Sequence, residues 1–272
     1  MLDGYKNSNG ISKKNVALNL VARPPALGKP VKEIELNNWN KTTGKTFFIG
    51  EFSSSRLLSA LLDSDLGRLM PYFQAVTFAC GENVYQPDDG GHFIYFPESA
   101  VFSQINILED GKTVETAMIG NEGIVGITAI LGSQISSVPW TQTLVGGNAL
   151  KINTLIFKQE FRRNGVLHPA FFEYLNTFIK QITQKAVCNQ HHLIEERFST
   201  WLLMIDDRCG NDKLVLTHEQ IAHFLGVHRP SVSCIAQNLR DRGIINYSRG
   251  RISILDRLSL ENSACECYTV IN

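Results

Sequence analysis

Cationic and small hydrogen-bonding side chains are concentrated in one short part of this chain. Residues 229–251 contain five arginines and one aspartate, whereas the whole chain of 272 residues has 26 Lys plus Arg and 26 Asp plus Glu. A local basic patch on an electrically neutral protein is an electrostatic footprint for a polyanion. Guanidinium groups bind phosphate oxygens and base edges through paired hydrogen bonds, so the chemistry of this segment favours nucleic acid.

Two short helices with a tight turn between them would position these side chains. Thr217 and Gln220 have the spacing of a capping box, which predicts a helix over residues 218–225. Gly226 can end that helix in a left-handed conformation, and a second helix begins near Arg229 with a proline in its first turn. This pattern predicts a helix-turn-helix.

The second helix separates apolar from polar side chains. Its inward stripe consists of Val232, Ile235, Ala236 and Leu239. Its outward face consists of Arg229, Ser231, Ser233, Cys234, Gln237 and Asn238. One cation with several small hydrogen-bonding groups suits the DNA major groove, where base edges present donors and acceptors.

A β-hairpin is expected directly after the second helix. Gly243 ends the helix, and two short strands flank a turn at residues 248–250. Such a hairpin forms a wing beside the DNA backbone. The residues that we expect to contact phosphates are Thr217, His218, Arg249 and Arg251. A three-helix packing unit with a polar surface is the alternative, and the local basic charge favours the winged helix-turn-helix.

These features resemble the DNA-binding domain of the Crp/Fnr family of bacterial transcription regulators. The residues that carry the resemblance read TxxQIAxxLGVxRPSVSxxxxxL from Thr217 and GIINYSRGRISILD from Gly243. The resemblance extends from about Leu57 to the end of the chain. It implies double-stranded DNA and RNA polymerase as partners and no enzymatic activity, and it puts Arg229 and Ser231 at positions that usually contact DNA. Ser233 and Cys234 fall near the base-reading surface.

The target sequence of well-studied members does not transfer to this chain. Pro230 and Cys234 stand where those members have a glutamate and an arginine that read bases. Another possible function also stays open, in which the chain regulates other family members by dimerising with them. Its sign would be an intact dimer without any preference for a DNA sequence.

Composition and periodicity divide this α+β chain into four regions. We predict a weakly structured tail over 1–54, an antiparallel β jelly roll or barrel over 55–168, a dimerisation helix over 169–192 and the winged helix-turn-helix over 193–272. By resemblance the barrel is a sensor domain of the cyclic-nucleotide-binding type. Before the barrel strands we expect a helix over 57–69. Short alternating strands are expected from Gln74 to Phe157, and examples are 84–86, 92–96, 101–108, 113–119 and 148–152.

The sensor domain departs from the pattern of members that bind cyclic AMP. Those members carry a Gly-Glu pair followed by an arginine that pairs with the cyclic phosphate. In this chain Ile127 stands at the acidic position, and no arginine occurs between Arg68 and Arg162. Burying an anionic phosphate without a cation is costly, so we expect no cyclic nucleotide to bind and leave the effector unassigned.

No cofactor, catalytic residue or metal-binding residue is assigned from the sequence. Members with an iron–sulfur cluster place several cysteines near the N-terminus, whereas no cysteine precedes Cys80. His92 and His168 are the candidate haem ligands, but a single histidine beside a strand is more often structural. A jelly-roll metalloenzyme would need more ligands than His92 and Glu98 offer.

One constellation leaves a metal- or thiol-redox-responsive regulator open as an alternative function. Cys188, His191 and His192 lie at i, i+3 and i+4, so on a helix the thiol could share a metal with either histidine. Cys265 and Cys267 lie close together near the C-terminus. Nothing in the sequence brings this pair to the helix.

The region 169–192 carries the seam of a two-stranded coiled coil. Its positions alternate steps of three and four residues, and they are Phe172, Leu175, Ile179, Ile182, Ala186 and Asn189. Ala186 would let two helices approach closely and Asn189 could fix their register. The alternative is that this stripe packs on the chain's own barrel. A homodimer suits the DNA hypothesis because its two recognition helices would meet major grooves about 34 Å apart.

The remaining sequence features predict a cytoplasmic protein. No apolar run approaches the roughly 18 residues of a membrane span. The segment MLDGYKNSNGISKK has no apolar core of the kind that secretory signals contain. The six cysteines are scattered along the chain, which is typical of reduced thiols.

Overall fold

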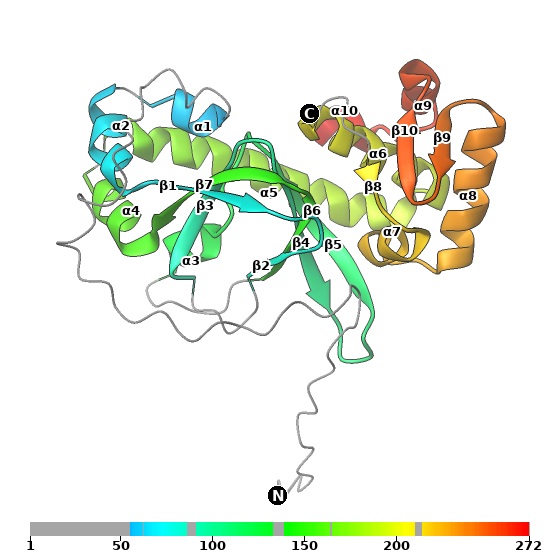
Figure 1. The fold of residues 1–272 in the computed structure, drawn as a ribbon, viewed down its shortest axis with the longest axis horizontal. Helices are drawn as coiled ribbons and strands as arrows, with labels where there is room; N and C mark the ends of the chain where they lie inside the picture. The colour runs from blue at the N-terminus through cyan, green and yellow to red at the C-terminus, as the bar shows by residue number, and fades with distance from the viewer. Residues whose placement is uncertain are drawn as a thin grey trace, which may run out of the picture.

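The computed structural model describes residues 55–61, 63–85, 91–132, 139–163, 165–209 and 214–271. The predicted tail over 1–54 therefore lies outside the described residues. Figure 1 shows an N-terminal β domain and a C-terminal domain of helices and short strands, with one long helix running along both.

Two antiparallel sheets form the N-terminal domain. The first has the strand order β1–β7–β3, with β1 at Gln74–Phe78, β7 at Gly147–Asn153 and β3 at Phe93–Pro97. The second has the order β2–β6–β4–β5, with β2 at Asn83–Tyr85, β6 at Trp140–Val145, β4 at Val101–Ile107 and β5 at Thr113–Ile119. This arrangement confirms the predicted antiparallel β domain.

Apolar side chains of both sheets fill the core between them. In β3, Ile94 and Phe96 are fully buried, and Phe102 of β4 is buried with them. The ring of Phe96 packs edge-on against Phe73 with centroids 5.5 Å apart. Because alternate residues of a strand point to opposite faces, the spacing of Ile94 and Phe96 places both on the core side.

Short helices lie on the side of the β domain that is away from the C-terminal domain (Figure 1). They are α1 (Arg56–Ser59), α2 (Asp63–Leu69), the 3-10 helix η3 (Met70–Tyr72), α3 (Ile127–Leu131) and α4 (Thr154–Phe161). The prediction of a single helix over 57–69 is wrong, because α1 ends at Ser59 and a separate helix, α2, begins at Asp63. Leu61 and Leu66 are both buried, whereas five residues of continuous helix would turn them about 140° apart.

Two consecutive helices connect the domains. Helix α5 (Leu167–His191) begins two residues before Pro169, and α6 (Ile194–Cys209) follows directly. Pro169 is the third residue of α5, where the backbone N–H that proline lacks would have no intrahelical acceptor. None of the described helices is long and apolar enough to cross a membrane.

The C-terminal domain consists of short elements around a second core. They are β8 (Leu214–Val215), α7 (His218–Leu225), α8 (Arg229–Asp241), β9 (Ile245–Ser248), β10 (Arg251–Ile254), α9 (Arg257–Asn262) and α10 (Cys267–Ile271). Strands β8, β10 and β9 form one antiparallel sheet in that order. Trp201 and Phe198 of α6 are fully buried in this core, and α10 returns to lie against α5 and α6.

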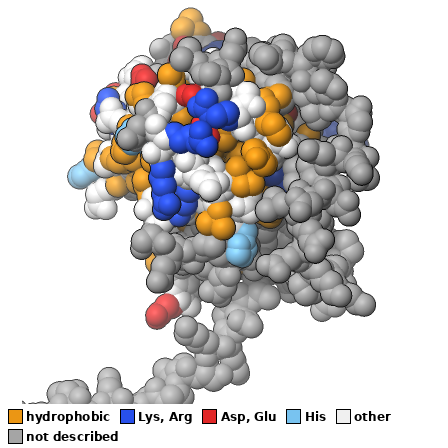
Figure 2. Space-filling view, turned by 90° about the vertical axis from the view of Figure 1, so that its left-hand side faces the viewer, with side chains coloured by type: hydrophobic (Ala, Val, Ile, Leu, Met, Phe, Trp, Pro, Cys, Tyr) orange, Lys and Arg blue, Asp and Glu red, His pale blue; other side chains and the backbone are white. Residues whose placement is uncertain are grey.

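The end of the β domain that lies far from α8 has a mixed surface. Figure 2 shows basic, acidic and hydrophobic side chains interspersed on the described part of this face. Near α2 and α4, Arg68 forms ion pairs with Asp65 and Glu160, and Arg163 lies 3.1 Å from Glu160. These arginines are therefore engaged by neighbouring carboxylates.

Candidate nucleic-acid interface

Helix α7 begins and ends as the sequence predicted. The backbone N–H of Gln220 donates to Thr217 Oγ1 at 3.2 Å, and the Gln220 side chain accepts from the Thr217 N–H at 2.9 Å. Both contacts together form the predicted capping box. Gly226 ends the helix with φ of 65°, the left-handed conformation that glycine adopts without steric cost.

Helix α8 presents a polar face over a short buried stripe. Val232, Ala236 and Leu239 are buried against the rest of the domain. The predicted base-reading residues on the other side are exposed or half-buried, and they are Arg229, Ser231, Ser233, Cys234 and Gln237. Arg229 lies in the first turn, so its guanidinium can extend past the N-terminal end of the helix.

The wing is a two-residue β-hairpin. Ser248 of β9 pairs with Arg251 of β10, which leaves Arg249 and Gly250 as the turn. Both turn residues have positive φ, 50° for Arg249 and 77° for Gly250, as in a type I′ turn. Among the described residues Arg249 is the one non-glycine with positive φ, and its exposed side chain lies at the tip of the wing.

His218 connects α7, α8 and the wing. Its Nδ1 atom lies 2.8 Å from Ser233 Oγ, and its ring stacks on Tyr247 of β9 with centroids 4.2 Å apart. Burial and the nearby charge of Arg229 lower the pKa of His218, so the ring is neutral at pH 7. Its Nε2 atom is buried without a hydrogen-bond partner in the described part of the chain. In this conformation His218 and Ser233 therefore support the interface, whereas Thr217, Arg249 and Arg251 are exposed toward solvent.

Two polar side chains of the α8 region interact with neighbouring carboxylates. The Gln237 amide donates to both carboxylate oxygens of Asp241, at 2.7 and 2.9 Å. Arg242 lies 2.7 Å from Glu195 of α6 in an ion pair. Arg242 therefore helps to hold α8 against α6. Arg229 remains exposed in the first turn of α8.

The residues of the predicted dimer seam differ in how exposed they are in the monomer. Phe172 and Ile179 are 46% and 51% exposed, and Ala186 continues their line at the same seven-residue spacing. Leu175 and Ile182 are only half-buried but pack against the chain's own core. Helix α5 therefore has an exposed apolar ridge formed by Phe172, Ile179 and Ala186, which is available to a second copy. Leu175 and Ile182 pack on the chain's own β domain, as the alternative interpretation predicts.

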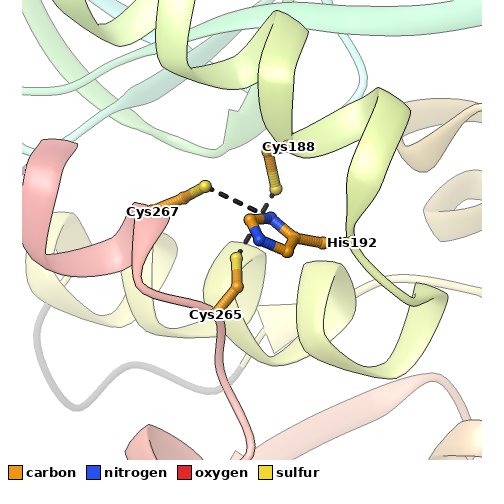
Figure 3. A group of neighbouring side chains, drawn as sticks. All are labelled: Cys188, His192, Cys265 and Cys267. Carbon is orange, nitrogen blue, oxygen red and sulfur yellow. Dashed lines mark hydrogen bonds between the residues drawn. The ribbon is translucent and has the colours of Figure 1, made fainter.

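Thiols and one histidine assemble where α5 ends. Cys188 and His192 lie beside Cys265 and Cys267, and the donor atoms of all four are within 4.8 Å of one another (Figure 3). His191 is not part of this group. Burial raises the pKa of the Cys188 and Cys267 thiols. The spacing of Cys188 and His192 could be seen in the sequence, but only folding brings Cys265 and Cys267 to them.

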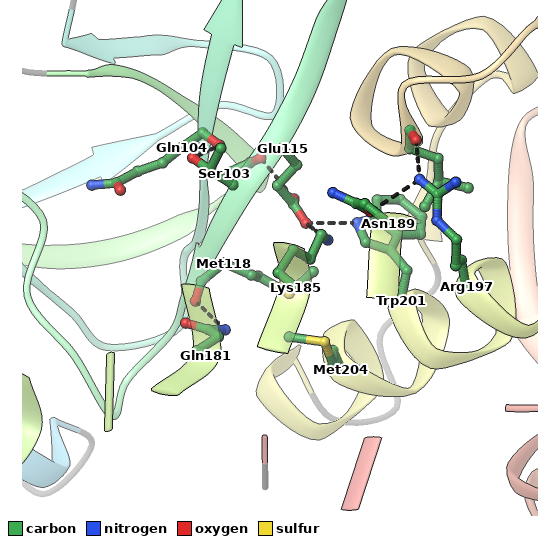
Figure 4. A network of polar contacts seen from close by, with 12 residues as sticks. Ser103, Gln104, Glu115, Met118, Gln181, Lys185, Asn189, Arg197, Trp201 and Met204 are labelled. Atoms are coloured by element: carbon green, nitrogen blue, oxygen red, sulfur yellow. Dashed lines mark hydrogen bonds and ion pairs between the residues drawn. The ribbon is translucent and has the colours of Figure 1, made fainter. Parts of the chain in front are cut away.

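Polar contacts join the β domain to the C-terminal domain. Glu115 of β5 is fully buried and accepts from Lys185 of α5 at 2.8 Å and from Trp201 of α6 at 3.1 Å (Figure 4). Ser103 donates to its second carboxylate oxygen at 2.7 Å. One carboxylate thus links three elements, so a displacement of β5 would be transmitted to α5 and α6.

Helix α7 also rests directly on the β domain. Thr113 Oγ1 donates to the backbone oxygen of His223 at 3.1 Å. A Cβ at Gly226 would lie 3.3 Å from Val114, so the turn of the helix-turn-helix lies close to the start of β5. None of these contacts could be predicted from the sequence, because they join residues more than one hundred positions apart.

The two-sheet domain, the long helix and the winged helix-turn-helix define a DNA-binding regulator with a separate β domain. Residues 196–263 match the Crp-like helix-turn-helix domain. The anaerobic regulatory protein of Bacillus subtilis (strain 168) is 22% identical over 181 residues, which cover 64% of this chain and 76% of that protein. The chain is therefore a transcription regulator with a Crp-like helix-turn-helix DNA-binding domain.

Solved structures of bacterial regulators share the fold of most of this chain. A transcriptional regulator of the Crp/Fnr family from Eubacterium rectale superposes with a TM-score of 0.61 at 17% identity and covers 76% of this chain and 96% of its own. FixK2 from Bradyrhizobium japonicum gives a TM-score of 0.60 at 16% identity and covers 71% of this chain and 98% of its own. At these identities the likeness concerns the fold.

Proposed function

We propose that this regulator binds a two-fold-symmetric DNA site as a homodimer. The observation that carries the proposal is the exposed face of α8 flanked by the Arg249 wing. Arg229, Cys234 and Gln237 would meet base edges in the major groove, while Thr217, Arg249 and Arg251 would neutralise phosphates. Ser231 completes the base-reading set, and His218 with Ser233 would hold α7, α8 and the wing in register.

The dimer in this proposal forms through the exposed ridge of α5. Phe172, Ile179 and Ala186 would meet the same residues of a second copy, with Leu175, Ile182 and Asn189 at the edge of the seam. A two-fold axis parallel to α5 relates two copies of α8. Two recognition helices about 34 Å apart would then enter successive major grooves on one side of the duplex.

The β domain in this proposal senses a signal other than a cyclic nucleotide. Ile127, at the position where nucleotide-binding members have an acidic residue, is a buried core residue of α3. An apolar core side chain cannot accept a hydrogen bond from a ribose hydroxyl, and burying the cyclic phosphate without a cation is costly. Calorimetry that detects micromolar binding of cyclic AMP or GMP would contradict this part of the proposal.

The proposed setting is the bacterial cytoplasm, and the chain itself is not an enzyme. Its six cysteines form no disulfide in the described structure, which fits a reducing compartment. RNA polymerase is the protein partner that a transcription regulator of this type would contact at a promoter. Among the described residues, neither His92 nor Glu98 belongs to the group of side chains that could hold a metal ion.

A selection from random-sequence duplex DNA tests the proposal. The full chain is incubated with the library near physiological salt, bound DNA is sequenced, and the enriched site is used to measure affinity. We expect a two-fold-symmetric site. Arg229→Ala should weaken specific binding by about 1–3 kcal/mol because a base contact is lost. Arg240→Ala, at the other end of α8, is the matched control and should retain the affinity.

Two outcomes would contradict the proposal. Enrichment of a site without two-fold symmetry would exclude the dimer arrangement. No enrichment, even after a cell extract is added as a source of effector, would exclude specific DNA binding by this chain. An intact dimer in that second case would support the reading in which it acts by dimerising with other regulators.

A further inference from the structure

Three thiols and one imidazole from distant parts of the chain converge where α5 ends. Cys188 lies in the last turn of α5, His192 follows that helix, Cys267 is the first residue of α10 and Cys265 lies two residues before it (Figure 3). The Sγ atoms of Cys188 and Cys265 are 3.6 Å apart. The Sγ atom of Cys267 lies 3.3 Å from Nδ1 of His192. The four donor atoms therefore surround one small volume.

These separations are close to those of a mononuclear tetrahedral metal site. With zinc–sulfur bonds of about 2.3 Å and zinc–nitrogen bonds of about 2.0–2.1 Å, tetrahedral ligand atoms lie roughly 3.5–3.8 Å apart. The four donors here lie within 4.8 Å of one another, so small side-chain rotations would complete the geometry. Three cysteines and one histidine are also a ligand set of structural zinc sites, which have no open position.

The surroundings of the four donors match those of metal ligands. Nε2 of His192, on the side of the ring away from Cys267, lies 3.2 Å from the carboxylate of Glu266. A carboxylate in that position accepts the second ring N–H and fixes the tautomer in which Nδ1 is free to bind a metal. Gln184 Nε2 donates to Cys267 Sγ at 3.0 Å, and Thr200 Oγ1 lies 3.2 Å from Cys265 Sγ. Polar groups therefore already face the sulfur atoms.

We propose that Cys188, His192, Cys265 and Cys267 bind one Zn²⁺ ion through three thiolates and Nδ1 of His192. Coordination displaces the three thiol protons to solvent. The first ligand pair precedes α6 and the second follows α9, so the ion closes a loop that contains the whole DNA-binding domain. It would fix both ends of that domain to the end of α5. This site goes beyond the proposed DNA-binding function and does not depend on it.

Burial of unreactive thiols is the competing account of the cluster. Cysteines often pack as small apolar side chains, and Cys188, Cys265 and Cys267 do form a small buried cluster with Ile271. That account explains the burial of the sulfur atoms. It does not explain why an imidazole nitrogen joins them while a carboxylate lies on the other side of the same ring.

Metal content of the full chain tests the site. The protein is purified under reducing conditions, loaded with Zn²⁺, freed of excess ion and measured by mass spectrometry of the elements. We expect one zinc per chain in the wild type and in Cys80→Ser, whose cysteine lies outside the cluster. The double variant Cys265→Ser, Cys267→Ser should lose it. Loading with Co²⁺ should give the intense visible absorption of a tetrahedral thiolate complex in the first two proteins only.

Adjacent histidines provide a matched pair of variants. His192→Ala should weaken metal binding, whereas His191→Ala removes an exposed neighbour of the same type and should leave it unchanged. Glu266→Gln should weaken metal binding about 10–100-fold, because loss of a carboxylate behind a ligating histidine has effects of that size. Circular dichroism and size-exclusion chromatography establish that each variant is folded.

Several results would overturn the zinc site. They are a wild type that retains no zinc or cobalt after loading, equal metal content in His191→Ala and His192→Ala, or iron found together with acid-labile sulfide. A disulfide between Cys188 and Cys265 in protein purified with reductant would also contradict it. If the cysteine variants do not fold, alkylation of the wild type decides the question. Zn²⁺ should protect these three cysteines but not Cys80 from the reagent.

Discussion

Arg249 occupies a backbone conformation that costs folding free energy and therefore points to a role outside folding. A non-glycine residue in the left-handed region is disfavoured by about 1–2 kcal/mol, while asparagine tolerates it well. We expect Arg249→Asn to leave the stability unchanged or to raise it by at most about 1 kcal/mol. The same variant should lower the slope of log affinity against log salt concentration by about one unit per protomer, because one phosphate contact is lost.

Urea unfolding and DNA titrations at several salt concentrations measure the two effects of Arg249→Asn separately. Arg240→Asn, an exposed arginine at the far end of α8, serves as the control for the loss of one charge. A variant that unfolds more easily but binds DNA with the wild-type salt dependence would show that Arg249 serves the fold.

His218 makes the stability of the DNA-binding domain depend on pH. Burial and Arg229 lower its pKa in the folded state below the ordinary value of about 6.5. The unfolded chain therefore binds more protons between the two pKa values, and stability rises with pH in that interval. The contribution is fully present above about pH 6.5 and is lost as the pH falls through the lowered folded pKa.

Urea midpoints at pH 7.5 and 5.5 measure this contribution of His218. The wild type and His228→Gln, which changes an exposed histidine next to α8, should lose stability equally between the two pH values. His218→Gln retains a hydrogen-bonding side chain but cannot take up a proton, so it should lose less. An identical pH dependence in all three proteins would mean that Ser233 and Tyr247 hold His218 equally well when it is protonated.

Among the elements, those with local signals were predicted well and those that depend on distant contacts were not. Helix α7 matches its predicted range because the capping box and Gly226 act within a few residues of the helix ends. Strand β6 is not among the strands named from the sequence, and its Thr141 and Thr143 are buried only through contacts with neighbouring strands in the folded chain. The short helices α9 and α10 were missed as well, since the contact of α10 with α5 is set by the fold of the whole domain.

The candidate site likewise contains residues that local patterns predict and residues that only tertiary contacts bring together. The outward face of α8 and the turn of the wing follow from periodicity and turn chemistry, so their residues could be named from the sequence. The stacking of Tyr247 on His218 and the meeting of Cys265 with Cys188 join separate elements. Such contacts depend on tertiary packing, which a single sequence does not reveal.

Helix α5 provides the prediction that belongs to the element scale. Ile179 lies in the centre of the exposed ridge, and a charge buried between two copies without a partner would be costly. We expect Ile179→Glu to turn the dimer into a monomer in sedimentation velocity and to abolish tight binding to a two-fold-symmetric site. Thr177→Glu, which adds the same charge to an exposed position away from the ridge, should remain dimeric. A dimeric Ile179→Glu would place the interface elsewhere.

At the scale of the molecule, the buried Glu115 is the contact that makes the β domain and the DNA-binding domain one unit. Its carboxylate holds Lys185 of α5 and Trp201 of α6, while Thr113 on the same strand bonds to α7. An effector that moved β5 would have to break or shift these contacts. It could change DNA binding only to the extent that it binds the shifted arrangement more tightly.

Glu115→Gln tests this link because it keeps the shape of the side chain and removes its charge. The variant leaves the Lys185 ammonium buried without a counter-charge, which should destabilise the protein by about 3–5 kcal/mol. In calorimetry we expect a lower unfolding temperature and separate transitions for the two domains. Adding Lys185→Met should restore much of the loss, since the glutamine oxygen can still accept from Trp201 and no charge remains unpaired. Glu109→Gln, on the exposed turn before β5, is the control and should unfold like the wild type. If Glu115→Gln also unfolds like the wild type in a single transition, the domains are coupled through the Thr113 contact with α7 instead.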